Sequence, residues 1–553
     1  MPTLRLRPCY RAYLLTLFVL LLGYSQVRDS SLKPDFSAEL TVVTRRADTG
    51  EVVPSRVYLF KGTRPYRLSP ADAMLPLRID SFYRERLWRQ DGDSKVLEVT
   101  ARDQSHFILL EGQASFHLPR SLIDQDEKYR LEVYHGMFFE PAEVEFTLQA
   151  DEAKTITVDL KPIAPGRQER WLAADDHIHL MRAKEDDEVF LKWLRAEDLA
   201  VGNFLELQRQ QHAALQYAYG PKGEARAKGH SIRSGHETRS RFYGHTIVLG
   251  PNEMIRPLSI GHMYANAPAA YPFPAVFFEQ GKAAGGLAGF AHFYGSQPNS
   301  TLIMDLARKT LDFVELFQFG VLHTQSWYEL LNAGFRVVGL AGSDFPANLR
   351  PEDWPRIFPL LGPERALVKA EPGASAYDAW QQGVRQGAVL VSNGPLLEFA
   401  VNGKSSGATS SWTGGSETLQ GEASVVFHRP IEKLEIVVNG RVVAAKVGDA
   451  KQTELKLGFE VPVSESSWIA ARASALHRKG EFEIWAHANP AYFLKDGKPV
   501  YVEADRKAVR ERWEKEAAYY RNPALVFEKD EQRQHLLRIV QETRDILAAA
   551  PNR

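Results

Sequence analysis

The sequence predicts an α/β protein with a central domain of alternating strands and helices, two flanking β-sandwich domains and a helical tail. Short runs of period two fill residues 36–162 and 398–495, a pattern typical of β-sandwiches. Apolar strand-like runs alternate with helix-like runs over residues 167–397, which predicts βα units around a parallel, barrel-like sheet. Residues 505–550 carry the apolar periodicity of helices.

The first residues predict a secretory leader. Three arginines precede an uncharged run, residues 12–24, that is dominated by Leu, Phe and Val. A positive segment followed by a short apolar one is typical of a signal peptide, and the run is short for a membrane span. We therefore expect residues 1–27 to be a signal peptide or an N-terminal anchor. The protein is then exported, either periplasmic or secreted, and touches a membrane only through an uncleaved anchor.

Length and composition narrow the class of protein. A chain of 553 residues is too long for one core and predicts several domains. The apolar content of 44% and charged content of 25% are ordinary for a globular protein. A net charge of -1 gives no basic footprint for nucleic acid, so we expect a small-molecule substrate instead. Cys9 is the only cysteine and lies before the apolar run, so the mature chain has no disulfide.

The first sandwich is predicted from four alternating runs, at residues 40–44, 129–133, 144–148 and 156–160. Apolar side chains at every second position line one face of a strand. These runs contain no catalytic constellation, so we expect this domain to serve in packing or targeting.

In the central domain, strands are expected at residues 172–178, 199–205, 246–249, 287–291, 313–317, 337–341 and 388–392. Helices are expected at 189–199, 327–333 and 377–384, with Gly334 and Gly387 as C-terminal caps of the last two. About seven βα units of this kind gather their loops at one end of the sheet.

The second sandwich contains the strongest turn signal of the chain. Asn439-Gly440 separates the apolar runs 434–438 and 441–443, which predicts a two-residue hairpin. The tail that follows is expected to break at Asn522-Pro523. Its second half carries an apolar stripe for docking on a neighbouring domain, with a dimer helix as the lesser alternative: Leu536, Val540, Thr543 and Leu547.

Residues that can bind metal ions gather in the central domain. Nine of the 16 histidines fall between His177 and His323. Histidines at i and i+2, as in Asp175-Asp176-His177-Ile178-His179, project from the same face of a strand. Of the other candidates, His292 and Asp344 lie at the ends of expected strands and His245 lies at the start of one. Glu237 lies in an expected polar loop at residues 235–239. The complete set of candidate ligands is His177, His179, Glu237, His245, His292 and Asp344.

Each of these residues has a structural explanation when taken alone. His245 and His292 could be core histidines bonded to the backbone, Asp344 could cap a turn, and Glu237 could be a solvated carboxylate. Taken together in one α/β domain, however, His, Asp and Glu at converging strand ends predict a site for divalent ions with open positions for water.

Several motifs resemble those of the PHP (polymerase and histidinol phosphatase) superfamily. They include Asp175-Asp176-His177-Ile178-His179, His292 at a strand end and Gly342-Ser343-Asp344. The chain is most similar to the CehA/McbA-like branch, which contains the carbaryl hydrolase. The segments that carry this closer similarity are Trp327-Tyr328, Leu331-Asn332-Ala333-Gly334-Phe335, Trp380, Ser392-Asn393-Gly394-Pro395-Leu396 and Val438-Asn439-Gly440.

The resemblance implies a distorted (β/α)7 barrel with divalent ions, Zn, Mn or Fe, at its mouth. The six candidate ligands match the ligand positions of the family, and Glu237 would bridge two ions. PHP proteins often place a histidine where this chain has Pro346, which leaves the number of ions at two or three. The acidic residue that usually follows the HxH motif could be Glu185, Asp186 or Asp187.

The sequence and the resemblance together predict a metal-dependent hydrolase that uses metal-bound hydroxide on an ester, amide or carbamate bond. No Gly-x-Ser-x-Gly elbow occurs. Catalytic candidates besides Glu237 are His323, His236 and Arg239, for proton transfer or oxyanion support, with a structural role as the alternative for each. Two other functions stay open. Arg233, Arg239 and Arg241 suit a phosphoesterase, and Pro346 is compatible with an exported binding protein whose metal site is degenerate.

Overall fold

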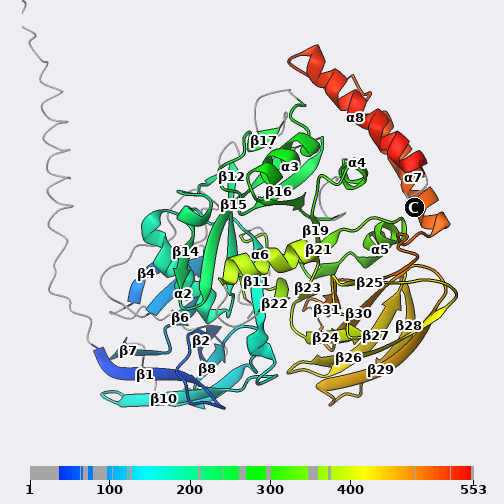
Figure 1. Ribbon diagram of the computed structural model, residues 1–553. Helices are drawn as coiled ribbons and strands as arrows, with labels where there is room; N and C mark the ends of the chain where they lie inside the picture. The colour runs from blue at the N-terminus through cyan, green and yellow to red at the C-terminus, as the bar shows by residue number, and fades with distance from the viewer. Residues whose placement is uncertain are drawn as a thin grey trace, which may run out of the picture.

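The structure is a computed structural model, and it describes most of residues 36–549. The gaps lie at residues 63, 66–72, 79–95, 102–103, 121–122, 124–127, 209–212, 241, 261–269, 294–300, 347–358, 371–374, 480 and 524. The predicted leader and Arg241 fall outside the described residues. The protein is of the mixed α/β type, with a central sheet, two further β-rich parts beside it and a helical tail (Figure 1).

Seven strands form the core of the central part. They are β11 (Trp171–Ile178), β12 (Val201–Gln208), β15 (His230–Ser240), β16 (Gly244–Leu249), β18 (Leu287–Phe290), β19 (Phe313–Gln318) and β21 (Val338–Ala341). They pair in this order. All neighbours are parallel except β16, which runs antiparallel to both β15 and β18. The expectation of a wholly parallel sheet is therefore wrong at this strand.

The first and last of these strands are joined by the segment that follows β21. The backbone N–H of His179 donates to the carbonyl of Phe345 at 2.7 Å, and Phe345 N–H donates to the carbonyl of His177 at 3.2 Å. Gly342 permits this approach, because a Cβ there would lie 1.9 Å from Asp176 Oδ1 and 2.9 Å from the backbone nitrogen of His177. The chain ends of β11 and β21 consequently lie side by side.

Helices pack on the outside of these strands. They are α2 (Asp187–Ala196), α3 (Pro274–Ala283), α4 (Leu302–Ala307), α5 (Thr324–Asn332) and α6 (Ala376–Gln386). The tryptophans of α5 and α6 are buried and donate to the backbone: Trp327 Nε1 donates to Val337 O at 3.1 Å, and Trp380 Nε1 donates to Ala366 O at 3.2 Å. The helix C-cap expected at Gly387 is confirmed, with φ of 70°.

The largest error in the predicted elements concerns β15. Residues 235–239 were expected in a polar loop, but they lie within a buried strand. It pairs with β12 on one side and β16 on the other, so its backbone groups are satisfied inside the sheet. Its polar side chains conceal the period-two signal. A second strand absent from the prediction, β22 (Arg365–Lys369), pairs antiparallel with β11.

The N-terminal part contains two sheets that enclose a core of aliphatic and aromatic residues. One sheet has the order β10-β1-β7, and the other has the order β4-β5-β6-β2-β8-β9, with β3 beside β2. The pair β1 and β10 is parallel, unlike the antiparallel pairing that the sequence predicts. The bounds are β1 (Phe36–Arg46), β2 (Ser55–Lys61), β3 (Arg64–Pro65), β4 (Ala73–Arg78), β5 (Val96–Ala101), β6 (Gln104–Leu110), β7 (Gln113–Pro119), β8 (Tyr129–Tyr134), β9 (Ala142–Phe146) and β10 (Ala153–Leu160).

The C-terminal β-rich part continues the central sheet. β23 (Val389–Ser392) pairs with β31 (Ile484–Ala488), while β24 (Leu396–Val401), β26 (Glu417–Val426) and β29 (Glu454–Val463) form a separate sheet. The expected boundary between residues 397 and 398 falls inside β24. The remaining strands are β25 (Thr409–Trp412), β27 (Ile431–Val438), β28 (Arg441–Val447), β30 (Ser467–Ala475) and β32 (Ala491–Lys495). The hairpin at Asn439-Gly440 is confirmed, since Val438 pairs with Arg441.

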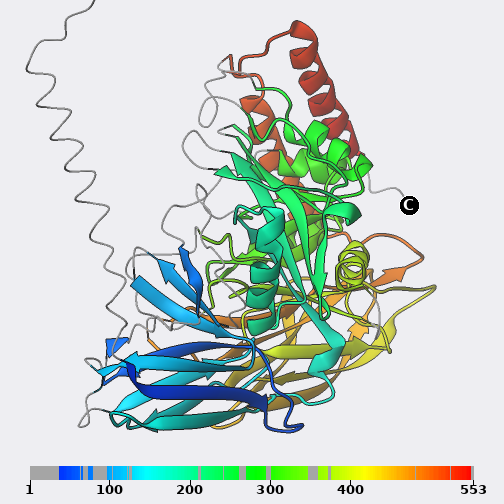
Figure 2. The same ribbon diagram turned by 90° about the vertical axis from the view of Figure 1, so that its left-hand side faces the viewer.

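Two helices form the tail, α7 (Glu503–Tyr519) and α8 (Asp530–Ala548). The apolar stripe predicted on α8 is buried, and α8 lies against α4 of the central part. Figure 2 shows the tail beside the central strands, on the side away from the two β-rich parts. Within the described ranges, no helix has both the length and the apolar character needed to cross a membrane.

Candidate metal centre

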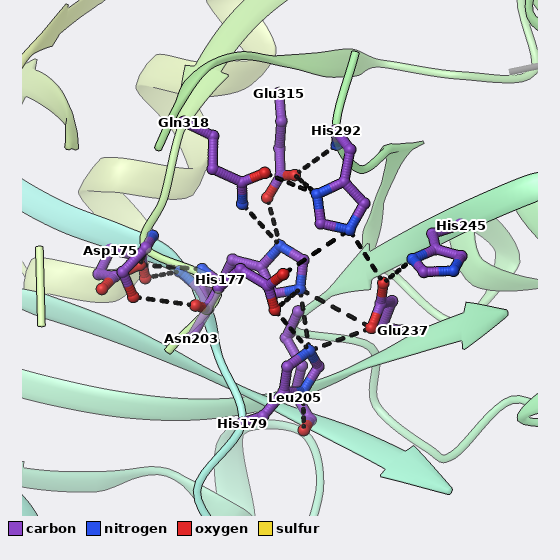
Figure 3. Close-up of polar contacts among 12 residues, drawn as sticks. Asp175, His177, His179, Asn203, Leu205, Glu237, His245, His292, Glu315 and Gln318 are labelled. Atoms are coloured by element: carbon purple, nitrogen blue, oxygen red, sulfur yellow. Dashed lines mark hydrogen bonds and ion pairs between the residues drawn. The ribbon is translucent and has the colours of Figure 1, made fainter. Parts of the chain in front are cut away.

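The six candidate ligands lie in, or shortly after, five strands of the central sheet, β11, β15, β16, β18 and β21. Figure 3 shows that the side chains of His177, His179, Glu237, His245 and His292 converge at one place. Each is at most 5% exposed. Two of them, His292 with φ of 54° and Asp344 with φ of 50°, occupy the left-handed region of backbone conformation. Non-glycine residues rarely adopt it, and such strain gathers at functional sites. The fold therefore holds both side chains in place at some energetic cost.

One half of the site joins the two histidines of the HxH motif to Glu237 and Asp344. The Nε2 atoms of His177 and His179 face each other at 2.9 Å. Glu237 Oε2 lies 3.0 Å from His179 Nε2. Asp344 Oδ1 is 3.4 Å from the Nε2 atoms of both histidines. Ring nitrogens and carboxylate oxygens thus point at a common centre.

The other half of the site uses the second oxygen of Glu237. Its Oε1 lies 2.8 Å from His245 Nδ1 and 3.6 Å from His292 Nε2. Asp344 Oδ2 is 3.8 Å from His292 Nε2. Glu237 and Asp344 therefore each offer one oxygen to either half. Within each of two groups, His177–His179–Glu237 and Glu237–His245–His292, the donor atoms lie within 4.8 Å of one another.

A second layer of residues orients the histidines. His177 Nδ1 lies 2.5 Å from Glu315 Oε1, and His179 Nδ1 lies 3.1 Å from the carbonyl oxygen of Leu205. The backbone N–H of His292 donates to Glu315 Oε2 at 2.8 Å, and its Nδ1 is 2.6 Å from Gln318 Oε1. Acceptors of this kind fix ring orientation in metal sites and leave the other ring nitrogen available for an ion.

Sequence reasoning missed Glu315 and Gln318, although a signal was present. Both interrupt the apolar strand β19, whose residues are all buried. A charged side chain inside such a run needs a partner in the core. Here the partners are His177 and His292.

Electrostatics keep two of the candidate ligands, Glu237 and His245, in the forms that bind cations. Burial alone would raise the pKa of Glu237, but Arg239 and His245 outweigh burial and hold that pKa well below its usual range. Burial lowers the pKa of His245 to about 4. For His177, burial opposes protonation, but the carboxylates of Glu315 and Asp344 prevail and raise its pKa. Without an ion, a proton on this ring offsets part of the buried negative charge.

The residues present fit divalent cations. Glu237 Oε1 and Asp344 Oδ1 are buried and, among the described residues, receive no hydrogen bond of acceptable geometry. Buried acceptors in this condition are costly unless an ion satisfies them. A mixture of imidazole nitrogens and carboxylate oxygens suits Zn, Mn or Fe. These buried His and Glu groups could therefore hold metal ions.

The remaining sequence candidates have different surroundings. Arg239 is in the site, with its Nε donating to Glu237 Oε2 at 2.8 Å. His323 is half-buried at the start of α5, and burial lowers its pKa. The ring of His236 packs edge-on against Phe277 of α3, 5.1 Å away, and burial lowers its pKa to about 3. Because neighbouring residues of a strand point to opposite faces, His236 lies on the helix side of β15, away from Glu237.

The acidic residues after the HxH motif also have structural partners. Asp187 Oδ1 accepts from Arg182 Nε at 2.6 Å, and Asp186 Oδ2 accepts from the backbone N–H of Ala183 at 2.5 Å. Arg233 pairs with Glu224 at 2.5 Å. Arg182 also donates to Ser234 Oγ at 3.0 Å, which joins the segment before α2 to β15.

Comparisons with known proteins give little guidance. No family model matches the chain. No curated protein matches it. The lesion-specific endonuclease PfuEndoQ from Pyrococcus furiosus aligns with 39% of this chain and 56% of its own, at 12% identity and a TM-score of 0.25. An endonuclease Q complex with a 27-mer duplex carrying an abasic lesion covers the same shares at 11% identity and a TM-score of 0.25.

A third structure, a β-glucuronidase from Parabacteroides merdae, aligns with 80% of this chain and 60% of its own, at 9% identity and a TM-score of 0.17. The chain thus matches little more than half the length of each solved structure. These scores are too low to support a functional assignment, so function must be inferred from the site.

Proposed function

We propose that the protein is a metal-dependent hydrolase of the PHP superfamily, close to the CehA/McbA-like branch. Its substrate is a small molecule with an ester, amide or carbamate bond. The observation that carries the proposal is Glu237, whose two oxygens face two groups of buried histidines. In this proposal the seven central strands make a distorted (β/α)7 barrel, and the six candidate ligands hold two divalent ions, or three.

Different residues of the chain would bind the ions, orient the ligands and transfer protons. His177, His179, Glu237, His245, His292 and Asp344 would hold the ions. Bound divalent ions supply Lewis acidity that acidifies water and polarises the bond to be broken. Arg239 keeps Glu237 ionised and oriented through its hydrogen bond. Glu315 holds His177 by its Nδ1 atom, so that Nε2 points at the centre. His323 remains a candidate for proton transfer.

A phosphoesterase is the second candidate function. It is placed second because of the way the nearby guanidinium groups are paired. Among the described arginines of the β15 region, Arg233 pairs with Glu224 and Arg239 pairs with Glu237. Guanidinium groups already engaged with carboxylates are less available to a phosphate. This favours an uncharged ester, amide or carbamate bond. An exported binding protein with a degenerate metal site is the third candidate, because Pro346 cannot act as a ligand.

Metal content tests the proposal most directly. Protein lacking residues 1–30 is purified, incubated with Zn, Mn or Fe(II), desalted and subjected to elemental analysis, beside His177→Ala/His179→Ala. We expect at least one tightly held divalent ion in the wild type and its loss in the double variant. His477→Ala/His535→Ala is the matched control and should keep the ion. A wild type that stays empty with all three metals would overturn the proposal.

Hydrolysis assays then separate the candidate activities. The metal-loaded protein is offered nitrophenyl esters, anilides, aryl carbamates and nitrophenyl phosphate. Turnover of the uncharged substrates supports the first proposal, whereas turnover of the phosphate alone supports the phosphoesterase. A loaded protein that turns over none of them supports the binding protein. We also propose export, which fractionation of cells expressing the full chain would test.

A further inference from the structure

A large cavity lies where the three parts of the molecule meet. Its volume is about 870 Å³, within the range of ligand sites. The N-terminal part lines it through the end of β8, the central part through the loop before β22, and the C-terminal part through the ends of β26 and β31. Figure 1 shows both β-rich parts below the central strands.

One turn connects the cavity to the candidate metal centre. It follows β19 and begins with Gln318, which contacts His292. The ring of the next residue, Phe319, stacks on His292 with 6.1 Å between centroids and 12° between planes. The backbone N–H of Gly320 then donates to Glu364 Oε1 at 2.7 Å, and Glu364 lines the cavity.

The same turn also contacts Phe482, another residue that lines the cavity. A Cβ on Gly320 would lie 2.5 Å from the ring of Phe482, which also lines the cavity. Gly362, another lining residue, donates its N–H to Asp175 Oδ2 at 2.7 Å. Asp175 in turn accepts from the N–H of Ser343, next to the candidate ligand Asp344. On each of these two routes, two residues lie between the cavity lining and a candidate ligand.

The charges along the cavity are largely paired. Arg429 pairs with Glu481 at 2.5 Å. Arg130 pairs with Glu132 and, at 3.5 Å, with Glu143. Arg56, a third lining arginine, pairs with Glu197, so most of the guanidinium groups along the cavity face carboxylates and are less available to an anion. Their remaining N–H groups and oxygens can still donate to and accept from hydroxyl groups.

Aromatic faces and an unused polar atom complete the lining. Phe427, Phe482 and Tyr134 are among the residues that line the cavity. Nδ1 of His428 is buried and, in the described part of the chain, has no hydrogen-bond partner. Flat apolar faces beside paired donors and acceptors are suited to ring compounds that carry many hydroxyl groups.

We propose that this cavity binds an uncharged, polyhydroxylated ring compound of the carbohydrate class, at a site separate from the candidate metal centre. This binding does not depend on the proposed hydrolase function, because none of the candidate metal ligands lines the cavity.

Binding to protein without metal ligands tests this proposal separately. Saturation-transfer NMR and calorimetry are run with cellobiose, maltose and diacetylchitobiose as probes, and with glucuronate and glucose 6-phosphate as charged comparisons. Both wild type and His177→Ala/His179→Ala are used. We expect at least one uncharged disaccharide to bind both proteins equally, so an absent metal centre would leave this result intact.

Two variants assign the binding to the cavity. Phe482 is 38% exposed and Val447 is 68% exposed, so neither alanine substitution threatens the core. Phe482→Ala should weaken binding at least tenfold, Glu481→Gln should weaken it by a smaller factor, and Val447→Ala should leave it unchanged. The proposal is overturned if no uncharged disaccharide binds, if only the charged sugars bind, or if Phe482→Ala binds as the wild type does.

Discussion

Glu237 faces both halves of the candidate metal centre. Its carboxylate faces His179 with one oxygen and His245 with the other, so replacing it affects both halves of the site. We expect Glu237→Gln to lower the metal content from two ions per chain to one or none, because the amide lacks the charge that binds a shared cation. Elemental analysis of the desalted protein measures this.

A matched control lies on the neighbouring strand. Glu206 of β12 is buried to a similar degree, but it accepts hydrogen bonds from Gln216 N–H and Tyr219 OH instead of facing the histidines. Glu206→Gln should therefore retain the metal content of the wild type. Equal metal content in both variants would contradict a bridging role for Glu237.

Glu364 makes the stability of the protein depend on pH. Burial raises the pKa of Glu364 from 4.5 to about 7. Between pH 4.5 and 7, the Glu364 carboxyl therefore keeps its proton in the folded chain but loses it in the unfolded chain. Stability is fully present below pH 4.5 and falls as pH rises towards 7. A shift of this size corresponds to roughly 3 kcal/mol.

The variant Glu364→Gln removes this titration while keeping an acceptor for Gly320 N–H. We expect its free energy of unfolding, measured with urea at a series of pH values, to lack the part of the decline that Glu364 causes in the wild type. Parallel curves for the two proteins between pH 4.5 and 7 would show that Glu364 does not carry the effect.

Most of the candidate ligands could be predicted because they are polar residues near an end of an apolar run; Glu237, inside the polar strand β15, is the exception. His292 directly follows such a run, and His177 and His179 lie a few residues after another. Glu315 could be recognised as a charged residue inside an apolar run, but its partner could not. It lies inside a strand, and its role depends on His177, far away in the sequence. Spacing along a chain cannot reveal a partner of that kind.

The close approach of β11 to the segment after β21 depends on a single glycine. A Cβ at position 342 would lie 1.9 Å from Asp176 Oδ1, and both elements are fixed by backbone hydrogen bonds. We expect Gly342→Ala to destabilise the protein by about 3 kcal/mol or more, as overpacking does in buried sites. Urea unfolding followed by tryptophan fluorescence measures the change.

The control for this substitution is Gly458→Ala. Gly458 lies in β29, where an added Cβ would meet nothing within 4 Å. Because that site has room, stability should change little there. If both variants unfold alike, the approach of β11 and β21 is not limited by the side chain at 342.

Strands were predictable where the apolar pattern was uninterrupted, as at residues 287–291, and were lost where polar residues face the interior, as in β15. That strand is held by pairing with β12 and β16, which are distant in sequence. The direction of β16 was missed for the same reason. The local pattern of apolar and polar residues indicates which side chains are buried. Strand order and direction, in contrast, depend on contacts between segments that are remote in sequence.

The N-terminal part is attached to the central part through a buried ion pair as well as apolar contacts. Arg56 Nε lies 2.8 Å from Glu197 Oε1, and the two side chains are 2% and 0% exposed. Phe107 packs edge-on against Trp193 of α2, 5.8 Å between centroids. The C-terminal part is joined differently, since β31 extends the central sheet and Trp468 Nε1 donates to Asn332 Oδ1 at 2.7 Å. These connections should make the parts unfold together.

Removing Arg56 tests this coupling. Arg56→Met leaves the carboxylate of Glu197 buried without its cation, which costs about 3–5 kcal/mol for pairs of this kind. Glu197 belongs to the central part, so its destabilisation should spread to the C-terminal part. The urea midpoint measured by fluorescence of the C-terminal tryptophans should therefore fall together with the midpoint measured by circular dichroism of the whole chain. Arg45→Met, which removes the exposed pair between Arg45 and Asp159, should change neither signal. Early loss of the N-terminal part alone in Arg56→Met would show instead that it unfolds independently.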